Sequence, residues 1–203
     1  MEKPECLLTQ DEAMNFISRN LEVKYGPYNH EHNRDKLLQD LTRRWMQKIP
    51  FTTIKQLSLP APRTCPTYRE ALDDVMSGMG GLCATHAVAM WHVLTALDYN
   101  CEFALARFHD HTDHVCILVR DVSNVGDLHL VDVGSGYPAF EPIKIKDAKT
   151  GFVRKTDVKE EATSKYKYVR VDEGGRSWTS WLTNSSLRNC LPLGSKVYLL
   201  TTH

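Results

Sequence analysis

The spacing of apolar residues changes once along this 203-residue chain. Over residues 83–99 apolar side chains return at helical spacing along an alanine-rich segment, which predicts a helix with an apolar face. Beyond residue 99, short runs of β-branched and aromatic residues are separated by turn residues, a pattern typical of strands. A helical part followed by strands, without alternation between the two, predicts an α+β fold.

Capping signals mark two earlier helices. Thr9 with Glu12, and Thr67 with Glu70, are capping boxes in which each side chain can accept a backbone N–H of the first turn. We therefore expect a helix to begin directly after each threonine. The prolines within residues 55–66 predict a loop or an extended crossing between the helices.

The second half predicts an antiparallel sheet or barrel. Residues 122–127 and 172–175 are typical of hairpin connections. We expect two subdomains, a helical one over residues 1–99 and an antiparallel β-barrel over residues 100–203. The candidate strands cover residues 101–108, 114–121, 128–133, 166–171, 176–181 and 196–201.

Charge and cysteine content exclude several classes of protein. Lys+Arg and Asp+Glu each total 25, so no basic excess predicts binding to nucleic acid. The N-terminus lacks the pattern of a signal or transit peptide, and no apolar run reaches the roughly 18 residues of a membrane span. We therefore expect a cytoplasmic protein with no membrane partner. The six cysteines form no C-x-x-C pair, which predicts reduced thiols and no metal site built on such pairs.

One cysteine lies where a thiol is suited to react. Gly80, Gly81 and Leu82 lead into Cys83 at the point where a loop becomes a helix. The unpaired N–H groups and the dipole at a helix N-terminus favour a thiolate, and the same amides can bind a developing oxyanion. The alternative is that Cys83 is a small buried packing residue, as most single cysteines are.

A histidine and an aspartate supply candidate partners for this thiol. His114 opens a candidate strand, and Asp132 lies among apolar residues of the next one, where an unpaired carboxylate is costly to bury. The two face each other if the hairpin centres on Ser123. A base and a carboxylate on adjoining strands are the arrangement that a Cys-His-Asp triad needs. Alternatively, His114 is a polar residue at a strand end and Asp132 caps the turn over residues 133–136.

Four motifs follow one another along the chain: Ile49-Pro50-Phe51, Gly80-Gly81-Leu82-Cys83, Asp113-His114-Val115 and Leu130-Val131-Asp132-Val133-Gly134-Ser135-Gly136. In this order they resemble the arylamine N-acetyltransferases. The family's arginine before the glycines and its acidic residue after the cysteine are replaced here by Met79 and Thr85. The resemblance is strongest over residues 34–145, and the family's C-terminal lid segment is not found, which indicates a short or truncated member.

The resemblance implies a papain-like or transglutaminase-like cysteine core with a Cys83-His114-Asp132 triad. It implies ping-pong transfer of an acetyl group from acetyl-CoA, as co-substrate, to a small arylamine, arylhydrazine or N-hydroxyarylamine through an acetyl-Cys83 intermediate. Phe51 is then expected to line the acceptor pocket, and no metal is expected to take part.

Three other functions stay open. A hydrolase, thioesterase, peptidase, amide synthase or transglutaminase-like enzyme can use the same triad on a related fold. A relative without activity can bind a ligand or partner through the same core. His109, Asp110, His111, Asp113 and His114 are spaced closely enough to suggest a metal site, although a solvated loop explains them equally well.

Overall fold

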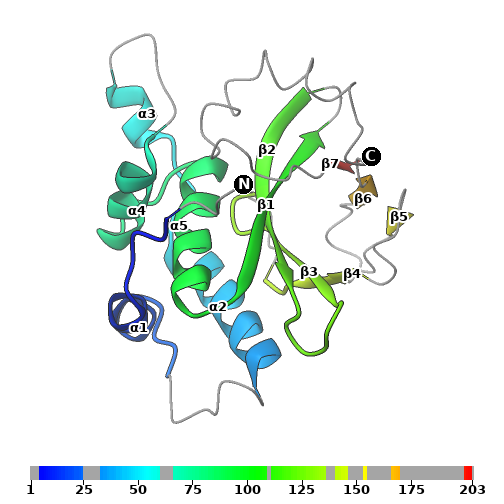
Figure 1. Cartoon of the computed structure of the whole chain (residues 1–203). Helices are drawn as coiled ribbons and strands as arrows, with labels where there is room; N and C mark the ends of the chain where they lie inside the picture. The colour runs from blue at the N-terminus through cyan, green and yellow to red at the C-terminus, as the bar shows by residue number, and fades with distance from the viewer. Residues whose placement is uncertain are drawn as a thin grey trace.

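A layer of helices covers one side of a mixed sheet (Figure 1). The computed structural model describes residues 5–24, 33–59, 66–108, 111–135, 140–145, 153–154, 166–169 and 199–202. In this part of the chain the helices precede the strands, which confirms the α+β class. The division into subdomains at residue 99 stays a prediction.

The helices are α1 (Gln10–Arg19), α2 (Arg34–Lys48), α3 (Ile54–Ser58), α4 (Tyr68–Met76) and α5 (Cys83–Ala96). Both capping boxes form as predicted, since the side chains of Thr9 and Thr67 accept the N–H groups of Glu12 and Glu70. The short helix α3 corrects the loop prediction for residues 55–66. Its residues precede the first proline of that segment, so nothing prevents one helical turn there.

The strands are β1 (Asn100–Phe108), β2 (His111–Arg120), β3 (Leu128–Val131), β4 (Ile143–Ile145), β5 (Val153–Arg154), β6 (Tyr166–Val169) and β7 (Leu199–Thr202). Their order across the sheet is β4-β3-β2-β1-β7-β6-β5. The candidate strand at 176–181 and the hairpin at 172–175 lie outside the described residues.

The predicted antiparallel barrel is wrong. Among the described residues the sheet is open, with β4 and β5 at its two edges, whereas a barrel requires the edge strands to pair with each other. The pairing is also not uniformly antiparallel, because β7 runs parallel to β1. Turn residues predict pairing only between strands that are neighbours in sequence, so they could not predict the pairing of β1 with β7.

Helix α5 forms the centre of the core. Every residue from Ala84 to Leu94 is buried, because the helix packs against the other helices on one side and against β1 and β2 on the other. A helix with apolar residues on most of its faces is typical of such an enclosed position, and its buried polar residues include His86 and His92. Trp45 of α2 is fully buried in the same cluster, so its replacement by alanine is expected to cost about 3–5 kcal/mol. Cys83 is the first residue of this most enclosed helix.

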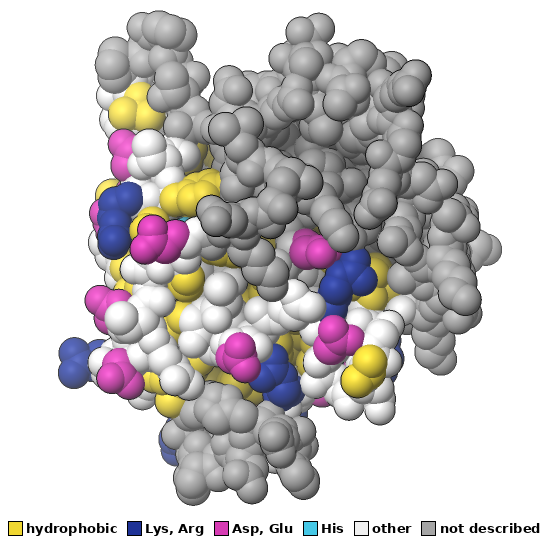
Figure 2. Space-filling model, in the orientation of Figure 1, with side chains coloured by type: hydrophobic (Ala, Val, Ile, Leu, Met, Phe, Trp, Pro, Cys, Tyr) yellow, Lys and Arg dark blue, Asp and Glu magenta, His cyan; other side chains and the backbone are white. Residues whose placement is uncertain are grey.

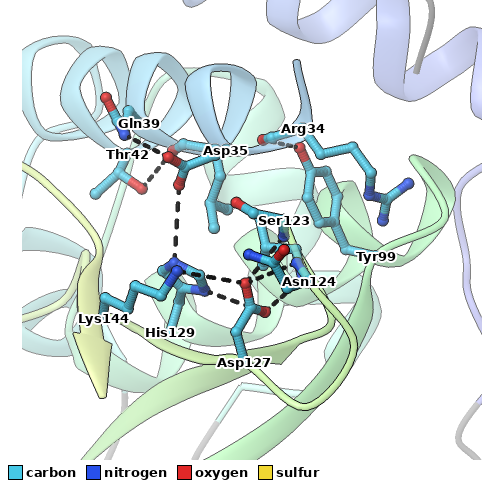
Figure 3. A network of polar contacts seen from close by, with 12 residues as sticks. Arg34, Asp35, Gln39, Thr42, Tyr99, Ser123, Asn124, Asp127, His129 and Lys144 are labelled. Carbon is cyan, nitrogen blue, oxygen red and sulfur yellow. Dashed lines mark hydrogen bonds and ion pairs between the residues drawn. The ribbon is translucent and has the colours of Figure 1, made fainter. Parts of the chain in front are cut away.

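A polar network joins the start of α2 to the β2–β3 hairpin (Figure 3). His129 of β3 is buried between two carboxylates, with Nε2 3.7 Å from Asp35 and Nδ1 3.8 Å from Asp127. Nζ of Lys144, on β4, lies 3.7 Å from the Asp127 carboxylate. The Asp127 carboxylate also accepts the backbone N–H groups of Val122, Ser123 and Asn124, which closes the hairpin loop.

The face of the molecule in Figure 2 carries acidic and basic side chains interspersed over the described surface, in keeping with the equal totals of the two signs. None of the helices in the described part of the chain combines the length and the apolar character that a membrane crossing requires.

Candidate functional site

The sulfur of Cys83 sits at the N-terminal end of α5. Leu82 is the N-cap residue, with an extended backbone and a side chain that cannot accept a hydrogen bond from the first turn. The first backbone N–H groups of a helix have no acceptor within the helix. Cys83 is only partly buried, unlike Ala84 to Leu94 of the same helix, so its side chain combines access with the positive end of a helix dipole.

Glycines bring the surrounding backbone close to Cys83. Gly80 has φ +69°, and a Cβ there would overlap the carbonyl oxygen of Pro50. A Cβ on Gly81 would lie 2.6 Å from the Thr85 side chain, and one on Gly134 would lie 2.7 Å from Cα of Cys83. The segment after β3 therefore packs directly on the backbone of the candidate nucleophile, which is possible only without a side chain at Gly134.

His114 and Asp132 meet as a buried pair. Nε2 of His114 lies 2.8 Å from Oδ1 of Asp132, and both residues are about 95% inaccessible to solvent, with exposed fractions of 5% and 4%. His114 lies within β2, and Asp132 follows the last residue of β3. The predicted contact between them is present.

The register behind this contact differs from the prediction. Ile117 pairs with Val131 and Arg120 with Leu128, so the hairpin centres on Asn124 and not on Ser123. Sliding an antiparallel pair by two residues keeps every side chain on the same face of the sheet, whereas sliding by one would reverse the faces. His114 and Asp132 therefore meet diagonally across the pair and not directly opposite each other.

The charge state of His114 follows from its neighbours. Burial by itself would lower the pKa of this histidine, but the Asp132 carboxylate and the hydrogen bonds with Asp132 and Cys83 outweigh it and raise the pKa to about 10. Because Nε2 is bonded to Asp132, Nδ1 is the ring nitrogen that remains for Cys83. The raised pKa favours the imidazolium form of His114 at neutral pH, with Asp132 at one ring nitrogen and Cys83 at the other.

The second oxygen of Asp132 explains why this attraction is strong. Oδ2 is buried and meets no hydrogen-bond donor among the described residues. A buried carboxylate with few donors depends on a nearby positive charge to offset its lost hydration. The positive charge is the one on His114.

Phe51 lies beside the loop that leads to Cys83. Its backbone forms a parallel bridge with Gly81, and the N–H of Thr52 donates to the Gly81 carbonyl over 3.0 Å. One face of the Phe51 ring stacks on His86, with the ring centres 6.0 Å apart, and the side chain remains 49% exposed. Met79 in the same loop is 47% exposed, so apolar surface borders the approach to this loop.

Two residues of the site region were not singled out from the sequence as part of it. His86, treated there as a packed or surface histidine, is buried one turn after Cys83 and bonds both Trp45 and Pro50. Gly134 was part of a motif, but nothing in the sequence assigned it a contact with Cys83. The signal for His86 was its place three residues after Cys83 on a helix, which puts both on one face.

The alternative metal cluster gains no support from these residues. His109 and Asp110 lie outside the described residues. His114 belongs to the suggested cluster and its side chain is described. Its Nε2 is hydrogen-bonded to Asp132, which is not a member of that cluster. Within the described ranges no group of three or more His, Cys, Asp or Glu side chains is arranged to hold a metal ion.

Comparison by sequence alone identifies no relatives. No protein-family model matches the chain, and no curated protein is detectably similar to it in sequence.

Comparison by structure finds similarity to solved arylamine N-acetyltransferases. The arylamine N-acetyltransferase of Salmonella typhimurium superposes with a TM-score of 0.56 at 17% identity, over 79% of this chain and 56% of its own. That of Mycobacterium abscessus superposes with a TM-score of 0.51 at 16% identity, over 86% and 59%. The arylamine N-acetyltransferase of Bacillus cereus, described by a Cys-His-Glu triad, gives 0.52 at 15% identity, over 80% and 61%.

The chain therefore spans less than two thirds of the length of these structures. At this level of identity the similarity establishes the fold alone, and any reaction has to be argued from the residues of the site. The structure confirms the resemblance first carried by the four sequence motifs: this chain has the fold of the arylamine N-acetyltransferases.

Proposed function

We propose that the protein is an acyltransferase that carries an acetyl group from acetyl-CoA on Cys83 and passes it to a small arylamine or hydrazine. The observation that carries the proposal is the buried His114–Asp132 pair at 2.8 Å, with His114 also hydrogen-bonded to Cys83 at the start of α5. A packing cysteine needs neither a base nor a buried carboxylate behind that base.

The first half-reaction starts from the thiolate of Cys83 beside the imidazolium of His114, which already holds the proton of this pair on Nδ1. The thiolate attacks the thioester carbonyl of acetyl-CoA, and the oxyanion that forms is stabilised by the first N–H groups of α5. The bond from the carbonyl carbon to the CoA sulfur then breaks, and CoA leaves as a thiol with the proton from His114. Asp132 keeps the ring oriented and balances its charge throughout.

In the second half-reaction the amine attacks the acetyl-Cys83 carbonyl. The carbon–sulfur bond to Cys83 breaks, and the amine proton passes to the Cys83–His114 pair, which restores the starting state. Phe51 offers a partly exposed aromatic face beside this loop, which suits an aryl acceptor.

The test is the mass of the intact protein after incubation with acetyl-CoA or with p-nitrophenyl acetate. We expect a single acetyl adduct that is absent from Cys83→Ala and present in Cys116→Ala, because Cys116 is a fully buried thiol that donates to the Ala104 backbone carbonyl. Adding an arylamine or an arylhydrazine is expected to remove the adduct and yield the acetylated amine.

Other outcomes separate the alternatives. An adduct that decays at the same rate with and without an amine identifies a hydrolase. A wild-type protein that forms no adduct with either donor contradicts both enzyme functions and leaves a binding protein.

A further inference from the structure

His86 connects three parts of the site region that are far apart in sequence. It is 1% exposed, and its ring lies between Trp45 of α2 and the Pro50–Phe51 segment. Nε1 of Trp45 lies 3.0 Å from Nδ1 of His86, and Nε2 of His86 lies 3.2 Å from the carbonyl oxygen of Pro50. The Phe51 ring stacks on it at an interplanar angle of 26°.

These partners determine the protonation of the ring. The indole N–H of Trp45 can only donate, so Nδ1 of His86 must carry the acceptor lone pair. The carbonyl of Pro50 can only accept, so Nε2 must carry the hydrogen. His86 is therefore neutral and in a single tautomer. Burial, the largest influence on this histidine, lowers its pKa and so also favours the neutral ring.

The Pro50 carbonyl links His86 to the loop that precedes Cys83. The same oxygen accepts the N–H of Gly81 over 3.3 Å, and the Gly81 carbonyl accepts the N–H of Thr52 over 3.0 Å. Gly81 precedes the nucleophile by two residues, and His86 follows it by one helical turn. The ring thus ties the loop before Cys83 to the helix that begins at Cys83, and presents Phe51 at the same place.

We propose that His86 is a positioning residue for the acyl-cysteine reaction: as a neutral donor and acceptor it holds the Pro50–Phe51 segment and the Gly81 turn in register with Cys83. His86 does not touch the reacting atoms. The inference rests on the proposed function, because it concerns the geometry of the same nucleophile. A displacement of about 1 Å in a site of this kind can lower a rate by about 10²-fold.

The substitution His86→Phe keeps a planar ring for Phe51 and removes both hydrogen bonds. His86→Gln is the conservative variant, because its amide places an acceptor and a donor on either side of one carbon, as the neutral ring does. His92→Phe is the matched control: His92 is also fully buried on α5, but its ring faces Leu7 and Tyr68. Trp45→Phe removes the donor that selects the tautomer and leaves His86 in place.

The first readout is the rate of Cys83 acylation by p-nitrophenyl acetate. We expect a fall of about 10–100-fold for His86→Phe, recovery in His86→Gln to within about 3-fold of wild type, and little change for His92→Phe. A folded His86→Phe protein that is acylated at the wild-type rate would overturn the proposal. Equal losses in His86→Gln and His86→Phe would also overturn it, because the donor–acceptor pair would then be irrelevant.

The second readout does not need acyl transfer. Alkylation of Cys83 by iodoacetamide, followed by intact mass with Cys83→Ser as reference for the other thiols, is expected to slow in His86→Phe and not in His92→Phe. If wild type forms no acetyl adduct, the proposed function fails, and the alkylation rates still decide the role of His86. Equal alkylation rates in the two variants contradict that role.

The third readout is nitrogen NMR of the histidine rings, which also serves if His86→Phe does not fold. Wild-type His86 is expected to stay in the Nε2–H tautomer at neutral pH, and Trp45→Phe is expected to release it and slow acylation together. A wild-type ring protonated at Nδ1 would overturn the proposal, and so would a Trp45→Phe protein with unchanged tautomer and unchanged rate.

Discussion

Two buried histidines of the same hairpin lie beside aspartates, yet they are held in opposite charge states. His114 meets Asp132 at 2.8 Å, and its pKa is raised to about 10 although burial opposes the shift. His129 lies 3.8 Å from Asp127 and 3.7 Å from Asp35, and burial lowers its pKa in spite of both carboxylates. The first difference between the two histidines is therefore the distance to the carboxylate, and Figure 3 shows the longer contacts of His129.

The second difference is how the carboxylate is already engaged. Asp127 accepts three backbone N–H groups and lies near Lys144, so much of its charge is neutralised before His129 is considered. Asp132 has one oxygen on His114 and no donor on the other among the described residues. A carboxylate that already accepts several backbone N–H groups thus raises the pKa of a neighbouring histidine little. A carboxylate with few other hydrogen bonds raises it much more.

Removing the strong partner is expected to have the largest effect. Asp132→Asn leaves burial to dominate His114, so its pKa should fall below the ordinary value near 6.5, and Cys83 acylation should slow by about 10³–10⁴-fold. Histidine NMR titration and the intact-mass assay measure the two. The matched change Asp127→Asn is expected to leave acylation at the wild-type rate. An Asp132→Asn protein within 10-fold of wild type (roughly 1.4 kcal/mol in barrier) would show that the pair is structural.

The next effect compares two glycines. Gly134→Ala puts a methyl group 2.7 Å from Cα of Cys83, so the segment that carries Asp132 must move, and acylation should fall by about 10–100-fold. Gly126→Ala, in the loop closed by Asp127, meets no atom within 4 Å but has φ +87°. It should cost about 1–2 kcal/mol of stability without changing acylation. Denaturant unfolding and acylation rates measured on both variants decide this; equal acylation losses would contradict the close approach at Cys83.

The pH dependence of stability should have opposite slopes for the two histidines. Burial lowers the pKa of His129 in the folded protein, so below about pH 6.5 the unfolded chain binds a proton at this histidine more readily than the folded chain does. The free energy of unfolding therefore falls as the pH falls. From about pH 6.5 to 10 folded His114 keeps a proton that the unfolded chain has lost, so its contribution falls as the pH rises. His129→Gln is expected to flatten only the acidic side of a plot of unfolding free energy against pH, and an unchanged acidic slope would contradict the assignment.

The smallest effect concerns Lys144. It is the least of the influences on His129 and acts to lower its pKa, and its side chain is 45% exposed. Lys144→Met is therefore expected to raise the pKa of His129 slightly and to change stability by less than about 0.5 kcal/mol. NMR titration of the ring measures the shift, and a fall in the pKa would contradict the charge balance described for this network.

Local signals in the sequence predicted local structure well. The capping boxes, the buried helix that begins at Cys83 and the hairpin over residues 122–127 depend on neighbours in the chain, and all three formed. The pairing of His114 with Asp132 was also predictable, because the alternation of faces in a strand survives a slide of two residues.

Features that depend on distant partners were not predictable in this way. The open sheet and its parallel pair join β1 to β7, and no turn signal links them. The role of His86 depends on Trp45 and Pro50, which lie on other elements. A single helical turn before a proline-rich segment, as in α3, is too short to show a periodicity.

The place of β7 in the sheet has a consequence for the order in which the protein assembles during synthesis. The half of the sheet from β1 to β4 can pair as soon as Ile145 has left the ribosome, since its strands are joined by near neighbours in sequence. Among the described strands, the other edge of β1 pairs with Leu199–Thr202 of β7, and β6 and β5 join the sheet through that strand. Because no earlier strand in the described part of the chain pairs with this edge, the nascent chain presents it unpaired until β7 is made, and such an edge favours aggregation or chaperone binding.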